Sequence, residues 1–168
     1  MELCYCPKCG KPELEDAGNK FSCECGFVLY QNTAAAVAVL LVSGNEILFT
    51  VRNQQPGLGK LDLPGGFCDP EETAEITCKR EILEELQLEL NEQNFKYLGS
   101  RPNIYPYKNI VYHTLDLFYS YELRDKPETV LEAKEIAGVK WISTRDLNLE
   151  DLAFESQKDF LKQYLRNQ

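Results

Sequence analysis

The stretch GGFCDPEETAEITCKREILEELQL, residues 65–88, decides the fold of this chain. Its pattern predicts a helix over about residues 72–88. At roughly 100° per residue, Glu81, Glu84 and Glu85 fall within about 100° of one helix face. Like charges three or four residues apart cost a helix roughly 0.2–0.5 kcal/mol per pair. The stretch therefore predicts either an idle solvated surface or a site where a cation takes the three carboxylates as ligands.

The segment ahead of the helix favours the cation site. LPGGFCDPEE, residues 63–72, places a proline and two glycines directly before the helix. A solvated helix does not need them, whereas a loop whose backbone must approach a ligand closely does. Ile76, Leu83 and Leu86 cluster within about 80° on the other side of the helix, and we expect that face to dock on a sheet.

The stretch resembles the signature of the Nudix hydrolase family: Gly, five residues, Glu, seven residues, then Arg-Glu-aliphatic-x-Glu-Glu-x-Gly-aliphatic. The matching positions are Gly66, Glu72, Arg80, Glu81, Ile82, Glu84, Glu85 and Leu88. Two positions differ, because Gln87 and Glu71 stand where the family, or many of its members, carry Gly. The glycine replaced by Gln87 ends a helix, so this departure concerns the local turn more than the chemistry.

The resemblance implies an α/β fold, an α/β/α sandwich with a mixed sheet, and a Mg²⁺ (or Mn²⁺) ion held by Glu81, Glu84 and Glu85. It also implies that Arg80 and Glu72 brace the loop against the helix. The implied substrates are nucleoside diphosphates linked to another group and cleaved at the phosphoanhydride. General chemistry agrees, since Mg²⁺ joins carboxylates to substrate phosphates and lowers the pKa of a bound water.

A further acid from outside the helix often serves as base or extra ligand in this family. Glu135 is the first candidate, because KEIAGVKWIS resembles the Glu-Ile-x-x-x-x-Trp segment of related hydrolases. Glu132 is the alternative, and either could be ordinary loop charge.

The remainder of the chain predicts a mixed sheet with helices on its faces. Five segments have the composition of strands, and one closing segment has the apolar spacing of an amphipathic helix. The strands are 34–42, 47–52, 96–99, 110–123 and 138–143, and the helix is 151–167. We divide the chain into a zinc ribbon over 1–32 and a Nudix hydrolase domain over 33–168.

Five of the seven cysteines lie in the first thirty residues. CPKCG and CECG look like the two knuckles of a zinc ribbon, with Cys6, Cys9, Cys23 and Cys25 as tetrahedral ligands of a structural Zn²⁺. The second knuckle has one residue between its cysteines where two are usual, so Cys4 is an alternative ligand, and inert cysteines are the other interpretation. A zinc ribbon ahead of a Nudix domain resembles the NADH pyrophosphatase branch of the family.

That branch carries Ser-Gln-Pro-Trp-Pro-Phe-Pro after its Nudix helix, and SRPNIYPY, residues 100–107, matches it in part. Tyr105 and Tyr107 are expected to stack on a base or nicotinamide, or else to pack between domains. Arg52 follows a strand and either pairs with a phosphate or is solvated. The single histidine, His113, lies in a strand and is interpreted as structural. The predicted substrate-binding residues are Arg52, Gly66, Asn103, Tyr105 and Tyr107.

Composition excludes some classes of partner. The formal net charge of -9 argues against a nucleic-acid or anionic-membrane surface. The apolar run over 34–42 is too short to span a bilayer. We expect a cytoplasmic protein with reduced cysteines, and a homodimer is the candidate assembly.

Our leading hypothesis is a Mg²⁺-dependent pyrophosphohydrolase acting on NADH, NAD⁺ or an ADP-ribose-like compound. The alternative from another class is a non-catalytic scaffold that senses a nucleotide and uses its zinc ribbon to bind a protein. A third possibility is a house-cleaning enzyme for damaged nucleoside triphosphates.

Overall fold

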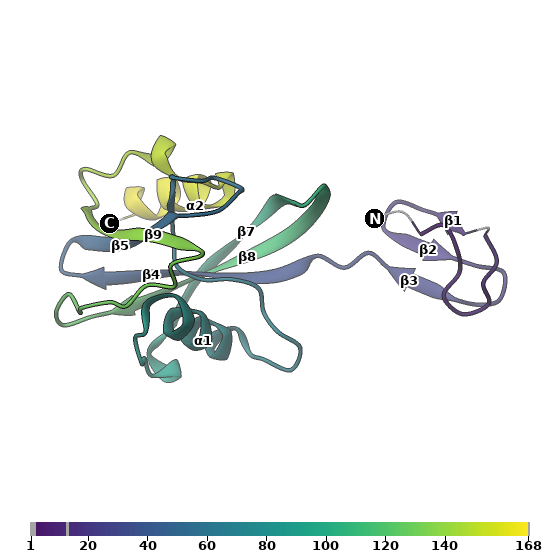
Figure 1. Ribbon diagram of the computed structural model, residues 1–168, viewed down its shortest axis with the longest axis horizontal. Helices are drawn as coiled ribbons and strands as arrows, with labels where there is room; N and C mark the ends of the chain where they lie inside the picture. Colours follow the sequence, from purple (N-terminus) through teal and green to yellow (C-terminus); the bar gives the residue numbers. More distant parts are fainter. Residues whose placement is uncertain (1–2, 13, 168) are drawn as a thin grey trace.

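The computed structural model describes residues 3–12 and 14–167, which form two β-sheets (Figure 1). The smaller sheet lies apart from the larger body and is joined to it by the chain that enters β4 (Figure 1). Its strands are antiparallel and run in the order β1 (Glu15–Asp16), β2 (Lys20–Ser22) and β3 (Val28–Tyr30).

The larger sheet has six strands in the order β6-β5-β4-β8-β7, and β9 also pairs with β5. β4 and β8 run parallel while the other pairs are antiparallel, so the predicted mixed sheet is confirmed. The strands are β4 (Ala34–Ser43), β5 (Glu46–Arg52), β6 (Leu61–Asp62), β7 (Lys96–Tyr107), β8 (Ile110–Glu122) and β9 (Ile136–Ser143).

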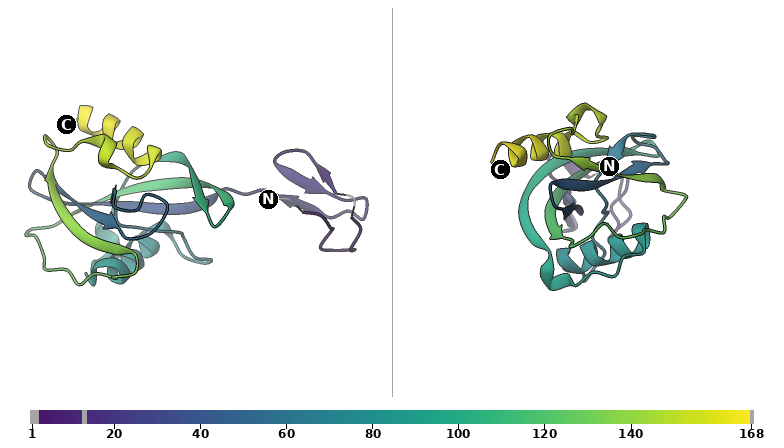
Figure 2. Two further views of the ribbon diagram at one scale, coloured as in Figure 1. Left: turned by 45° about the horizontal axis from the view of Figure 1, so that its top comes forward. Right: turned by 90° about the vertical axis from the view of Figure 1, so that its left-hand side faces the viewer.

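Helices α1 (Ala74–Leu86) and α2 (Glu155–Arg166) cover opposite faces of this sheet, as Figure 2 shows. Short 3₁₀ turns lie at Glu92–Asn94 and Leu149–Asp151. None of the helices in the described part of the chain has both the length and the apolar character that a membrane crossing requires.

The central strand β4 explains why the run AAAVAVLLV is apolar at nearly every position. Val39 packs in a core cluster with Ile82 of α1, while the next residue, Leu40, packs in a second cluster with Phe160 of α2. A strand covered on both faces loses the polar alternation of a half-exposed strand. The predicted helices on both faces of the sheet are therefore confirmed.

The predicted docking face of α1 is wrong for Ile76 and Leu83 and correct for Leu86. Ile76 and Leu83 are 39% and 36% exposed, whereas Cys78, Ile82 and Leu86 are fully buried. The helix is turned so that its acidic side also faces the fold, and the buried arc runs from the glutamates to Leu86. Apolar clustering alone misplaced the face because a functional helix buries charged side chains too.

SRPNIYPY continues the predicted strand at KYLG, so that β7 is one long edge strand paired with β8. An edge position tolerates Pro102 and Pro106, which have no N–H to give to a further strand. Lys108 and Asn109 both have positive φ angles, 46° and 65°, at the turn between β7 and β8. Two such residues match the twist of a tight hairpin.

Candidate active site

A cavity of about 400 Å³ opens between α1, the loop that precedes it, the β7–β8 hairpin and the start of α2. Strand β4 pairs with β5 only at the end near the β4–β5 turn, and the two strands separate beyond it. The loop over residues 64–68 pairs with the edge of β4 that is left free. Backbone hydrogen bonds join this loop to β4, with Val37 N donating to Gly66 O at 2.8 Å and Val39 N donating to Pro64 O at 2.9 Å. The loop thereby forms one wall of the cavity.

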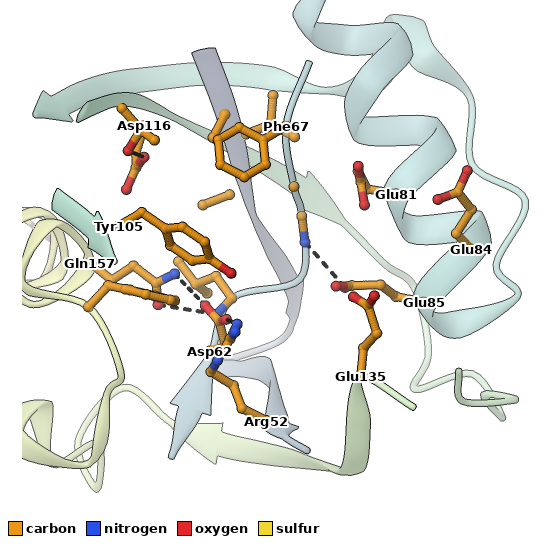
Figure 3. A pocket seen from close by; sticks show the side chains of 18 of the residues that line it. Arg52, Asp62, Phe67, Glu81, Glu84, Glu85, Tyr105, Asp116, Glu135 and Gln157 are labelled. Carbon is orange, nitrogen blue, oxygen red and sulfur yellow. Dashed lines mark hydrogen bonds and ion pairs between the residues drawn. The ribbon is translucent and has the colours of Figure 1, made fainter. Parts of the chain in front are cut away.

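Three glutamates of α1 line the cavity, and a fourth faces them from the residue before β9. Figure 3 shows Glu81, Glu84 and Glu85 along the helix and Glu135 opposite Glu85. The helix is positioned by its N-cap, since Thr73 Oγ1 accepts a hydrogen bond from Ile76 N at 3.3 Å. The structure thus brings the predicted ligands of the helix and the predicted extra acid to one wall.

Arg80 ties the loop to the helix. Its Nε donates to Glu72 Oε1 at 2.9 Å, its Nη2 donates to Phe67 O at 3.0 Å, and its Nη1 donates to Glu81 Oε1 at 2.7 Å. The hydrogen bonds that Arg80 donates to Glu72 lower the pKa of Glu72 to about 2. Glu72 does not line the cavity, so its position behind Arg80 suits a bracing role.

Glu81 and Glu85 are carboxylates whose charged forms are disfavoured by burial and by each other. Burial raises the pKa of Glu85 well above its ordinary value, and the neighbouring carboxylates of Asp62 and Glu81 raise it further. Burial also raises the pKa of Glu81, against the opposing effect of Arg80. A divalent cation would relieve this repulsion, and carboxylate oxygens are the donors that Mg²⁺ and Mn²⁺ prefer. The donor chemistry therefore fits such an ion, but the three carboxylates of α1 are not gathered within 4.8 Å of one another as the four cysteines are, so their side chains would have to close around it.

Gly66 permits the close approach of the loop to Glu81. A β-carbon at residue 66 would lie 2.5 Å from Glu81 Oε1 and 2.6 Å from its Cδ. The glycine at the first motif position is thus required by the space that the Glu81 carboxylate occupies.

The opposite wall holds an arginine in a buried network. Arg52 Nη1 donates to Asp62 Oδ2, and Arg52 Nε donates to Pro56 O at 2.6 Å. Gln157 Nε2 donates to Asp62 Oδ1, and Gln157 Oε1 accepts from Leu63 N at 3.2 Å. Burial raises the pKa of Asp62, while Arg52 opposes the shift. The network engages Nε and Nη1 of the guanidinium, and the Tyr105 hydroxyl also interacts with Arg52, so the arginine is held in place beside the cavity.

An aromatic cluster adjoins Arg52. The Tyr105 ring lies 5.7 Å from the Phe67 ring at an interplanar angle of 88°, and 5.7 Å from the Phe154 ring at 36°. The Arg52 guanidinium lies 5.0 Å from the Phe154 ring centre. Flat rings in this arrangement offer stacking surfaces for a base.

Four of the five predicted substrate-binding residues line the cavity, namely Arg52, Gly66, Asn103 and Tyr105. Tyr107 does not, and its ring lies 6.2 Å from Tyr105 farther along the hairpin, beside Lys108. The prediction missed several lining residues: Asp62, Phe67, Asp116, Phe154 and Gln157. Asp62 and Phe67 flank the glycine loop, which was the available signal, whereas Gln157 is 95 residues from Asp62 and had none.

The N-terminal cysteines form a second candidate site. The sulfur atoms of Cys6, Cys9, Cys23 and Cys25 all lie within 4.8 Å of one another, close enough to share one metal ion. Cys4 is exposed and outside this group. The short second knuckle is closed by a turn in which Gly26 N donates to Cys23 O at 2.9 Å, so one intervening residue is sufficient.

Comparison with known proteins identifies the class. The profile of the NUDIX domain matches residues 32–164, and the chain belongs to the Nudix family.

Among individual relatives, the "NAD-capped RNA hydrolase NudC" of Pseudomonas syringae is 30% identical over 145 residues, which are 85% of this chain and 49% of that protein. The mitochondrial "NAD(P)H pyrophosphatase NUDT13" of Mus musculus is 29% identical over 143 residues, 83% of this chain and 38% of that protein. The chain spans about half the length of the first of these relatives, or less for the second.

Solved structures show the same fold. A Nudix hydrolase from Nitrosomonas europaea superposes with a TM-score of 0.71 at 23% identity, over 99% of this chain and 92% of that one. The Nudix domain of Shewanella oneidensis NrtR in complex with ADP ribose superposes with a TM-score of 0.64 at 20% identity, over 83% of this chain and 91% of that one.

Proposed function

We propose that this protein is a Mg²⁺- or Mn²⁺-dependent hydrolase that cleaves the phosphoanhydride of a nucleoside diphosphate linked to another group, such as NADH, NAD⁺ or ADP-ribose. The observation that supports this most strongly is the convergence of four carboxylates, from α1 and from Glu135, on one wall of a cavity. The opposite wall supplies Arg52 and aromatic rings. One compound with a diphosphate and a flat base satisfies both walls.

Glu81, Glu84 and Glu85 would hold the metal ion. When bound, the ion would neutralise phosphate charge and make a water molecule more acidic. Arg80 keeps the Glu81 carboxylate in place through the 2.7 Å hydrogen bond and holds the loop through Phe67 O. A fixed carboxylate requires no reorganisation when substrate arrives.

Glu135 is the better candidate for the residue that accepts a proton from the attacking water. Glu132, its rival, uses Oε2 to accept hydrogen bonds from Lys134 N at 2.7 Å and Glu135 N at 2.9 Å. Glu132 thus closes the turn that presents Glu135. The Glu135 side chain points towards Glu85 in the cavity (Figure 3). A base must lie within hydrogen-bond reach of the water that it activates.

Arg52 would contact the diphosphate or the group attached to it, while Tyr105, Phe67 and Phe154 would stack on the base. Stacking of a base on an aromatic side chain contributes roughly 1–3 kcal/mol. The curated relatives named as NAD-capped RNA and NAD(P)H hydrolases support a dinucleotide-like substrate. The net charge of -9 favours the free compound over a capped RNA.

The cysteine cluster would hold a structural Zn²⁺, which would stabilise a sheet too small to form a core alone. We propose residues 1–32 as this ribbon and 33–168 as the catalytic domain. Reduced thiols are needed for the zinc site, so we place the protein in the cytoplasm.

The test is product analysis with NADH, NAD⁺, ADP-ribose, diadenosine polyphosphates, nucleoside triphosphates and NAD-capped RNA, each with Mg²⁺ and Mn²⁺. Glu84→Gln and Glu85→Gln should each lower kcat at least about 100-fold. Glu89→Gln, an equal change of charge at an exposed site just beyond α1, is the control. Wild-type turnover in both motif variants would refute the mechanism. Binding without turnover of any substrate would support the nucleotide-sensing scaffold instead.

A further inference from the structure

Asp116 is a buried acid on β8 that the proposed mechanism does not use. It is 7% exposed and lines the cavity. Figure 3 shows it on the side of Phe67 and Tyr105, away from Glu84. Its Oδ1 accepts a hydrogen bond from Thr114 Oγ1 at 2.7 Å.

Its other oxygen, Oδ2, accepts from Ser156 Oγ at 2.6 Å. A buried carboxylate is costly without a cation, and no ion pair in the described part of the chain involves Asp116. The nearest candidate in the sheet is Arg101, its cross-strand neighbour on β7. Arg101 is engaged elsewhere, because Nη1 donates to Ser100 O at 2.6 Å and Nη2 donates to Gln163.

Asp116 can accept further hydrogen bonds, and it is therefore selective for ligand groups that donate them. An ionised carboxylate accepts about four hydrogen bonds and donates none, and the two hydroxyl donors use about half of that capacity. The Asp116 carboxylate lines the same cavity as the aromatic cluster, so its remaining lone pairs are available to a ligand there. A ligand that presents an N–H group there gains a hydrogen bond, whereas one that presents a carbonyl oxygen meets repulsion.

We propose that Asp116 is a specificity-determining residue that accepts a hydrogen bond from the amino group of a flat ring stacked among Phe67, Tyr105 and Phe154. This inference rests on the proposed function. The amino group is either the exocyclic amine of an aminopurine or the carboxamide of nicotinamide. A site built to bond such a group discriminates strongly against the analogue that lacks it.

A purely structural role makes a different prediction. The bond from Ser156 joins β8 to the first turn of α2, so loss of Asp116 could simply loosen that helix. Loosening would lower stability and activity for all substrates alike. It would not change the ratio of kcat/KM between a compound that carries the amino group and its analogue that lacks it.

The experiment measures kcat/KM for two matched pairs on the full chain. ADP-ribose against inosine diphosphate ribose exchanges the adenine amine for a keto oxygen. NAD⁺ against nicotinic acid adenine dinucleotide exchanges the carboxamide for a carboxylate. We expect the amino member of one pair to be preferred about 10- to 100-fold, as befits a hydrogen bond to a charged acceptor, and the pair concerned identifies the ring.

Asp116→Asn, whose amide both donates and accepts, should bring that ratio close to one or invert it. Ser156→Ala keeps the carboxylate and should keep the preference. Ratios near one in both pairs for the wild-type protein would overturn the proposal whether or not the variants fold. An equal loss of preference in Asp116→Asn and Ser156→Ala would overturn it as well.

Failure of the proposed function can be separated from failure of this inference. If neither these four compounds nor any other member of the substrate panel above is cleaved, the proposed function fails. Calorimetric titration of the same pairs with Mg²⁺ then decides the inference, because a preference in Kd for the amino member supports it. Equal Kd values within both pairs, or no binding of any of the four, would overturn it.

Discussion

Replacement of Gly66 by alanine tests whether the position of the Glu81 carboxylate controls activity. The added β-carbon would lie 2.5 Å from Glu81 Oε1. Carbon and oxygen atoms normally stay well over 3 Å apart, so the carboxylate must move by about 1 Å. Misplacement of a catalytic group by about 1 Å can cost about 100-fold in rate, which corresponds to about 2.7 kcal/mol in the activation barrier.

The backbone at Gly66 needs no left-handed conformation, so the loop can accept alanine without strain. We therefore expect Gly66→Ala to change the free energy of unfolding by less than about 1 kcal/mol, while kcat with saturating Mg²⁺ falls about 100-fold. The assay is initial-rate kinetics on the best substrate, beside urea unfolding. Gly138→Ala is the control, because a β-carbon there meets nothing within 4 Å. Unchanged kcat in Gly66→Ala would refute the reasoning.

Three further predictions follow from the geometry. Gln87 ends α1 in the left-handed region, with a φ angle of 56°. Gln87→Gly should therefore stabilise the protein by about 0.5–1 kcal/mol, although it removes the side-chain hydrogen bond to Leu83 O. A lower melting temperature of the variant would contradict this. Because burial raises the pKa of Glu85 in the folded state, the metal-free protein should lose stability as pH rises above the ordinary value of 4.5 and through the raised pKa. Mg²⁺ should restore that stability, and Glu85→Gln should reduce the slope in melting curves recorded across pH, while Glu81 and Asp62, whose pKa values burial also raises, keep part of it. Cys9→Ser should release zinc, measured with a colorimetric reagent, and should unfold the N-terminal sheet, measured by NMR. Cys4→Ser should do neither, because of these two residues only Cys9 belongs to the four-sulfur cluster.

Local spacing along the chain was sufficient to predict what lies within one element. The glutamates of α1 share a side because a helix repeats every 3.6 residues, and the cysteine pairs predicted a metal site because each knuckle is a single turn. Glu71 and Gln87, the two positions where the family resemblance marked a missing glycine, both have positive φ angles. The positions of the main strands along the chain and the helices that cover the sheet also followed from hydrophobic patterning, whereas the strand order within the sheet did not.

Hydrophobic patterning could not predict which side of α1 faces the sheet. The side that packs inward includes glutamates, which a hydrophobic pattern assigns to solvent. The partners of Asp62 and Asp116 were also unpredictable. Gln157 and Ser156 come from α2, 95 and 40 residues away, and no local pattern encodes such a contact. Hydrogen bonds between distant segments depend on how the helix docks on the sheet. The sequence by itself determined the chemical groups available to this protein, and packing decided which of them meet in one cavity.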